Sequence, residues 1–132
     1  MKKLILVLMV FFCFSAVNAW ADFVIDKVTN GSVAMVKSGN TIDLNTTGNT
    51  KIHWSKFNSK DAVNINWNQQ SSSAWSVNII ESGMSTVFRG SLNSNANVML
   101  INKSGIAFTK DSTINMASFM ASTLELDTFD FD

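Results

Sequence analysis

The residue types that usually carry catalysis or bind metals are scarce in this sequence of 132 residues, which has His53 as its one histidine and Cys13 as its one cysteine. With a single histidine, the chain offers no histidine cluster for zinc and no Ser/His/Asp arrangement built on a second histidine. On a strand, His53 would point away from the face shared by Ile52 and Trp54. We therefore expect His53 to face solvent in a structural role, and we expect no metal and no cofactor.

Paired carboxylates are the other chemistry to consider, because two of them suffice for glycoside hydrolysis. The candidates stand singly in different segments: Asp43, Asp61, Glu81 and Asp111. An enzyme would need them clustered on one face with suitable partners. The sequence therefore favours a protein that is not an enzyme. One hypothesis that we keep open is a carbohydrate-active enzyme with a β-helical fold. It would be excluded if these carboxylates lie far apart.

Three tryptophans could form an aromatic platform for sugars. Trp54 and Trp67 share strand faces with Ile52 and Ile65, which predicts that both pack in the core. Trp75 follows a polar run, so surface recognition at a loop edge and simple packing are both open for it.

The start of the chain has the parts of a bacterial secretory signal peptide. A basic beginning and an apolar run over residues 4–14 lead to the small residues Ala19 and Ala21. This pattern predicts a signal peptide over residues 1–21, cleaved after Ala21 or, alternatively, after Ala19. We expect the Sec machinery to export the mature domain, residues 22–132, through the inner membrane.

Removal of this leader changes the charge and the redox chemistry of the chain. It takes away two lysines and the sole cysteine, which leaves eight basic residues against ten acidic ones and a net charge of about −2. The remaining lysines are scattered singly from Lys27 to Lys110. Because nucleic-acid-binding domains usually show a basic stripe, we expect no nucleic-acid partner.

Short apolar alternations recur at intervals close to ten residues and predict an all-β fold, which could be a sandwich, a barrel or a solenoid. Connections rich in Asn and Ser favour the solenoid, in which stacked amides can form ladders, although these residues could also be simple turn formers. The segment 116–120 is expected to be a turn or strand. The alternations are Val33/Met35, Ile42/Leu44, Ile52/Trp54, Val63/Ile65/Trp67, Val77/Ile79, Val98/Leu100, Ile106/Phe108, Ile114/Met116 and Leu124/Leu126.

Three blocks in order and at matching spacing carry a family resemblance. They are KIHWSKFNSKDAVNINW at residues 51–67, RGSLNSNANVMLINKSGIAF at 89–108 and TINMASFMASTLEL at 113–126. Each resembles a stretch of the N-terminal two-partner secretion domain of filamentous haemagglutinin and haemolysin-type exoproteins, also called the haemagglutination activity domain. A weaker likeness over residues 31–50 extends the resemblance to nearly all of the mature chain.

The resemblance implies a right-handed parallel β-helix with an N-terminal cap, spanning residues 22–132 as a C-terminally incomplete, truncated domain. It implies a secretion-targeting role, in which an outer-membrane β-barrel transporter with periplasmic domains recognises the domain and the cap nucleates folding at the surface of a Gram-negative cell. The product would be secreted or held at the cell surface. Full-length relatives would have a host-surface or glycan target.

The alternative hypothesis is a truncated haemagglutinin-like surface or adhesive module that is no longer actively secreted. A secretion-incompetent chain of this kind would stay in the periplasm. Its acidic-aromatic tail, residues 127–132, would leave an exposed strand edge.

The candidate site is the turn Asn102, Lys103, Ser104 and Gly105. It stands where the family has Asn-Pro-Asn-Gly, so the first Asn and the Gly are kept while the proline and the second Asn are lost. Gly105 can supply a positive φ angle. Two readings are equally weighted here: recognition by the transporter, or a turn needed only for the fold.

Overall fold

The computed structural model describes residues 22–124 and residue 131. Within this part, ten strands account for nearly all of the regular structure, which confirms the all-β prediction. Their bounds are β1 Phe23–Ser38, β2 Thr41–Phe57, β3 Val63–Gln69, β4 Trp75–Ile80, β5 Thr86–Phe88, β6 Gly90–Ser94, β7 Asn97–Ile101, β8 Ile106–Phe108, β9 Thr113–Asn115 and β10 Ser118–Ser122.

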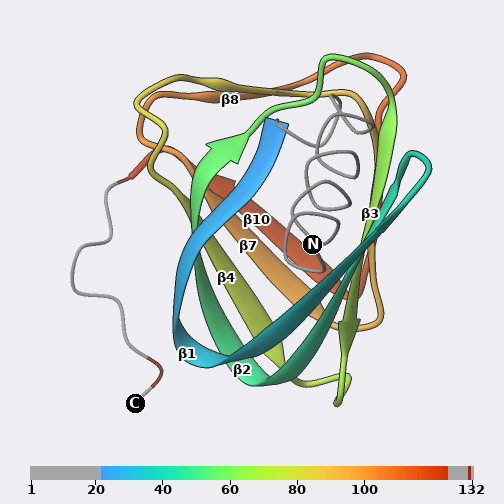
Figure 1. Ribbon diagram of the computed structural model, residues 1–132, viewed down its shortest axis with the longest axis vertical. Helices are drawn as coiled ribbons and strands as arrows, with labels where there is room; N and C mark the ends of the chain where they lie inside the picture. The colour runs from blue at the N-terminus through green and yellow to red at the C-terminus, as the bar shows by residue number, and fades with distance from the viewer. Residues whose placement is uncertain (1–21, 125–130, 132) are drawn as a thin grey trace, which may run out of the picture.

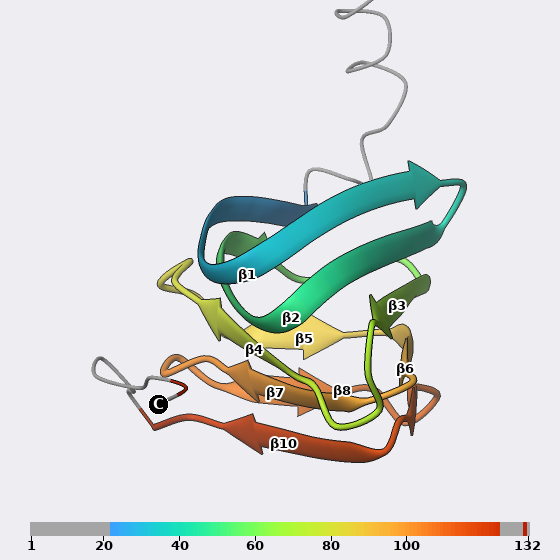
Figure 2. The ribbon, with the colours of Figure 1, turned by 90° about the horizontal axis from the view of Figure 1, so that it is seen from below.

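The strands wind into a parallel β-helix of about four turns, seen along the coil in Figure 1 and from the side in Figure 2. The first side joins the start of β2 to β3, β6 and β9 in parallel. The second side joins the end of β2 to β4, β7 and β10 in parallel. The third side pairs β5 with β8. The predicted solenoid is therefore confirmed.

Strand β1 caps one end of this coil. It pairs antiparallel with β2 from Phe23↔Phe57 to Ser38↔Thr41, and Figure 2 shows it across the end of the stack opposite β10. The connecting turn uses Gly39 at a φ of 58°, a conformation that glycine adopts without steric cost. The expected N-terminal cap is thus a long hairpin, and it shields the first parallel turn from water.

The interior is built by stacking equivalent residues of successive turns. Ile42 lies beside Ile65, and Ile65 lies beside Leu92, and all three are fully buried. Because each turn buries apolar surface mainly against the next one, stability accumulates turn by turn as in other solenoids.

Phenylalanines form a second stack along the coil. Ring centroids are 5.1 Å apart for Phe23 and Phe57, 6.4 Å for Phe57 and Phe88, 6.3 Å for Phe88 and Phe108, and 5.9 Å for Phe108 and Phe119. Three of these four contacts have steep interplanar angles, the arrangement that aromatic quadrupoles favour. This stack connects the cap to the last described turn.

A buried amide accepts hydrogen bonds from the two core tryptophans. Trp54, Trp67 and Asn78 are all fully buried, and both indole Nε1–H groups donate to Asn78 Oδ1, at 3.0 Å and 3.3 Å. The predicted core packing of these tryptophans is confirmed. Trp75 is partly exposed at the start of β4, so surface recognition and simple packing both stay open for it.

Amide ladders run along the outside of the first side. Asn66 Nδ2 donates to Asp43 Oδ1 at 3.0 Å, and Asn93 Nδ2 donates to Asn66 Oδ1 at 3.1 Å. At the corner after this side, Asn95 accepts from the Gln69 N–H at 2.8 Å and donates to its carbonyl at 2.7 Å. The ladder interpretation of these polar residues is confirmed, and it applies to strands as well as corners.

Candidate functional site

Asn102 follows β7 at the corner that leads to β8, and its side chain is turned into the coil. Only 1% of the residue is exposed. Its Nδ2 donates to the Met84 carbonyl and to Thr86 Oγ1, both at 2.9 Å, and its own N–H donates to the Ser122 carbonyl at 3.0 Å. Asn102 therefore joins the turns on either side of its own.

Thr86 extends this connection to the first turn. Its hydroxyl accepts from Asn102 and donates to the Phe57 carbonyl at 2.9 Å, and it is fully buried. Buried polar groups are costly when they lose a partner. The chain of hydrogen bonds from Asn102 through Thr86 to Phe57 thus holds three turns in register.

The rest of the turn depends on Asn102 and Gly105. Asn102 Oδ1 accepts from the Ser104 N–H at 2.9 Å, and the Asn102 carbonyl accepts from the Gly105 N–H at 3.0 Å. Gly105 has a φ of 118°, a backbone angle that residues other than glycine rarely adopt. The side-chain bond pre-forms the turn in the way an Asx turn does, so the tight turn forms here without proline.

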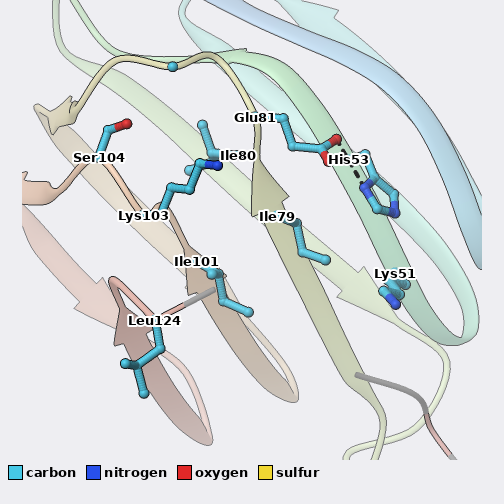
Figure 3. A pocket seen from close by; sticks show the side chains of 10 residues that line it. Lys51, His53, Ile79, Ile80, Glu81, Ile101, Lys103, Ser104 and Leu124 are labelled. Carbon is cyan, nitrogen blue, oxygen red and sulfur yellow. Dashed lines mark hydrogen bonds and ion pairs between the residues drawn. The ribbon is translucent and has the colours of Figure 1, made fainter. Parts of the chain in front are cut away.

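Lys103 and Ser104 form the exposed tip of the same turn. They line one wall of a surface cavity of about 360 Å³, together with Lys51, Ile79 and Ile101. Figure 3 shows how these side chains lie around the cavity. The four candidate residues therefore differ in burial: Asn102 is buried, Gly105 is partly buried, and Lys103 and Ser104 are exposed.

His53 takes part in a contact that the sequence did not predict. Its Nε2 lies 2.9 Å from Thr29 Oγ1 and its Nδ1 lies 3.1 Å from Glu81 Oε1, and Figure 3 shows the second contact. A neutral ring with its hydrogen on Nδ1 satisfies both partners. The side chain points away from the coil interior as expected, but the expectation that it faces solvent is wrong, because only 12% of it is exposed.

This contact ties the cap to the coil, since Thr29 belongs to β1, His53 to β2, and Glu81 follows β4. The order of hydroxyl, imidazole and carboxylate is that of a hydrolase triad. Here, however, Thr29 and Glu81 are exposed, and water weakens the polarisation that such a relay requires. We interpret the contact as structural.

The four candidate carboxylates belong to different elements. Asp43 lies in β2 and pairs with an amide, Asp61 precedes β3, Glu81 follows β4, and Asp111 precedes β9. Among the described residues, no group of three or more His, Cys, Asp or Glu side chains could hold a metal ion. The described residues also include no helix long and apolar enough to cross a membrane.

Comparison with known proteins connects this coil to secretion. The solved structure of the HMW1 secretion domain from Haemophilus influenzae matches with a TM-score of 0.74 and 30% sequence identity, over 77% of this chain and 27% of that one. This chain is a two-partner secretion domain. The resemblance drawn from the three sequence blocks is therefore confirmed, as is the parallel β-helix that it implied.

A second match is consistent with this two-partner secretion domain. The heme/hemopexin-binding protein of Haemophilus influenzae is 27% identical over 100 residues, which cover 76% of this chain and 11% of that protein. No protein-family model matches the chain. The chain thus spans about a tenth of the curated relative and about a quarter of the solved one. The predicted signal peptide, with Ala19 and Ala21, lies outside the described residues.

Proposed function

We propose that this domain targets a two-partner secretion exoprotein of the haemagglutinin, adhesin or haemolysin type for export. After Sec-dependent passage through the inner membrane, an outer-membrane β-barrel transporter recognises the domain through its periplasmic domains. The exoprotein is then released or held at the surface of a Gram-negative cell. The likeness to the HMW1 secretion domain, in both fold and sequence, carries this proposal.

The two ends of the coil suit a role in starting the folding of the exoprotein. The hairpin of β1 and β2 closes one end, while every residue of β9 is exposed at the other. The backbone groups along such an edge can pair with a further strand. Since each turn of a solenoid is stabilised by its neighbour, folding can proceed from the cap towards this edge.

The turn at residues 102–105 combines the two roles that the sequence left open. Asn102 is almost fully buried, so we assign it to holding the turns in register. Lys103 and Ser104 are exposed, so we assign transporter contact to them. Gly105 provides the backbone conformation that presents this tip.

The test is export in cells that carry a transporter of the two-partner secretion class. The chain is followed in culture supernatant and periplasm, as wild type, as Asn102→Ala and as the tip variant Lys103→Glu with Ser104→Ala. We expect the tip variant to lose about tenfold in export, the effect of roughly 1.4 kcal/mol of lost binding, with no change in thermal stability. We expect Asn102→Ala to lose both export and stability.

Two results would count against this assignment. Normal export of the tip variant would remove transporter contact from Lys103 and Ser104. Retention of folded wild type in the periplasm would contradict active secretion as a whole. The second result would instead support the alternative, a haemagglutinin-like surface or adhesive module that is not actively secreted and acts on a host-surface or glycan target.

A further inference from the structure

Strand β1 forms the edge of the sheet at the capped end of the coil. Among the described residues, β1 pairs with β2 alone, and Figure 2 shows no described strand beyond it. A strand that pairs on one side only leaves alternate backbone N–H and C=O groups along its other side, where a further strand can bind. The edge of β1 is therefore a surface that fits a strand of another chain.

The two halves of β1 differ in regularity. Between Val24 and Ser32 the pairing with β2 shifts register four times, and this half carries the charged residues Asp26 and Lys27. Bulges and charges of this kind keep other strands from pairing with an edge. Over residues 32–38 the register is continuous, and we call this segment the regular edge. The protection that the first half carries is much weaker here.

The hairpin turn determines which backbone groups of the regular edge face outward. A two-residue turn connects β1 to β2, so Ser38 and Thr41 form the first hydrogen-bonded pair of the hairpin. Hydrogen-bonded and non-hydrogen-bonded pairs then alternate along the continuous register. The N–H and C=O groups of Met35 and Val33 therefore point away from β2.

The side chains of the regular edge leave aliphatic groups in water. Val33 and Met35 pack against the core from the inner face of the strand. Ala34 and Val36 lie on the opposite face, where Ala34 is exposed and 50% of Val36 is exposed. Such side chains are good cross-strand neighbours on a sheet. The regular edge thus combines outward backbone groups with apolar side chains that a second strand would cover.

The regular edge is complementary to a second copy of itself. When two copies pair antiparallel about Met35, the two Met35 backbones face each other, and Ala34 lies opposite Val36 of the other copy. Lys37 then lies opposite Val33, so the two lysines are kept apart, and each lysine stem can lie along a valine. This register uses the whole regular edge and has the two-fold symmetry that is typical of homodimers.

We propose that two copies of this domain associate through their cap strands, as an antiparallel pair of regular edges. The coils meet at their capped ends, and their β9 and β10 ends point away from each other. The contact covers the exposed side chain of Val36 in both copies. Because a single strand pair is a small interface, and small interfaces are transient, we expect a Kd on the order of 100 µM.

The first experiment is sedimentation equilibrium of the protein as it accumulates in expressing cells, from about 5 to about 500 µM. Two double variants share Val36→Lys and differ only at residue 34. Ala34→Lys places lysine opposite lysine across the dimer, whereas Ala34→Glu places glutamate opposite lysine. We expect the glutamate variant to dimerise at least about tenfold more tightly than the matched lysine variant. Far-UV circular dichroism establishes that both are folded.

The second experiment tests the register by disulfide formation in a Cys13→Ser background. Ala34→Cys and Val36→Cys are prepared as separate variants and then mixed. Residues opposite each other in a non-hydrogen-bonded pair have Cα atoms about 4.5 Å apart, which is within reach of a disulfide. The mixture should therefore form a crosslinked dimer severalfold faster than either variant alone. These single substitutions also decide the matter if a double variant does not fold.

Three results would overturn the proposal. The first is a protein that stays monomeric over the whole concentration range. The second is a dimer with the same Kd in both double variants, because the contact would then lie on another surface, such as the β9 and β10 end. The third is a mixture that crosslinks no faster than its components. Neither experiment involves a transporter, so a failed export assay and a failed dimer are distinguishable.

Discussion

Asn102→Ala offers the most demanding test of how the turns are held together. The substitution removes three side-chain hydrogen bonds, to the Met84 carbonyl, Thr86 Oγ1 and the Ser104 N–H. A hydrogen bond contributes about 1 kcal/mol net, and a buried group left without a partner costs about 1–3 kcal/mol. Because Asn102 is almost fully buried, we expect a loss of about 2–4 kcal/mol in the free energy of unfolding.

For a domain of about 100 residues, this loss corresponds to a fall in Tm of roughly 10–25 °C. Urea unfolding of residues 22–132, followed by tryptophan fluorescence, measures the free energy directly. Ser104→Ala is the matched control, since it keeps the backbone N–H that Asn102 binds, and it should change stability by less than about 0.5 kcal/mol. A loss below about 0.5 kcal/mol for Asn102→Ala itself would refute the idea that this network holds three turns in register.

Three further substitutions, the first with a matched control, test other parts of the coil. Gly90→Ala should prevent folding, because its Cβ would lie 2.0 Å from the Val63 carbonyl oxygen, whereas Gly48→Ala has open space and should cost only about 1 kcal/mol; circular dichroism separates the two. Asn78→Leu leaves two buried indole N–H groups without an acceptor and should cost about 2–5 kcal/mol in chemical unfolding; an unchanged midpoint would contradict this. Phe88→Ala interrupts the ring stack and should cost about 3–5 kcal/mol, which calorimetry would detect as a lower Tm.

Loss of the His53 contacts should destabilise the cap locally more than it destabilises the whole domain. His53→Ala removes the contacts with Thr29 and Glu81, which connect the exposed part of the cap strand to the coil. Hydrogen exchange in the middle of β1 should therefore accelerate, while exchange in β7 stays unchanged. Equal acceleration in both strands would show that His53 stabilises the whole domain.

Much of the fold could be predicted from the chain alone. The alternation of Ile42 with Leu44, and of Ile65 with Trp67, identified the inward faces of two strands because strand side chains alternate with a period of two. The Asn-rich connections indicated stacked amides, and the three sequence blocks indicated the family. Such patterns lie within single segments of the chain, so they can be identified without knowing which strands become neighbours.

The alternation in the sequence by itself determined which side chains share a strand face, and so the apolar interior, whereas the parallel coil was implied by the family resemblance of the three sequence blocks. Only the tertiary structure decided which residues meet across turns. Asn102 bonds a threonine 16 residues earlier, Trp54 bonds an amide 24 residues later, and His53 has a partner 28 residues away. Turns of unequal length set these separations, and no local pattern encodes them. The stacking of the turns therefore decided three sets of contacts. These are the hydrogen bonds of Asn102 between turns, the hydrogen bonds of two tryptophans to Asn78, and the contacts of His53 between the cap and the coil.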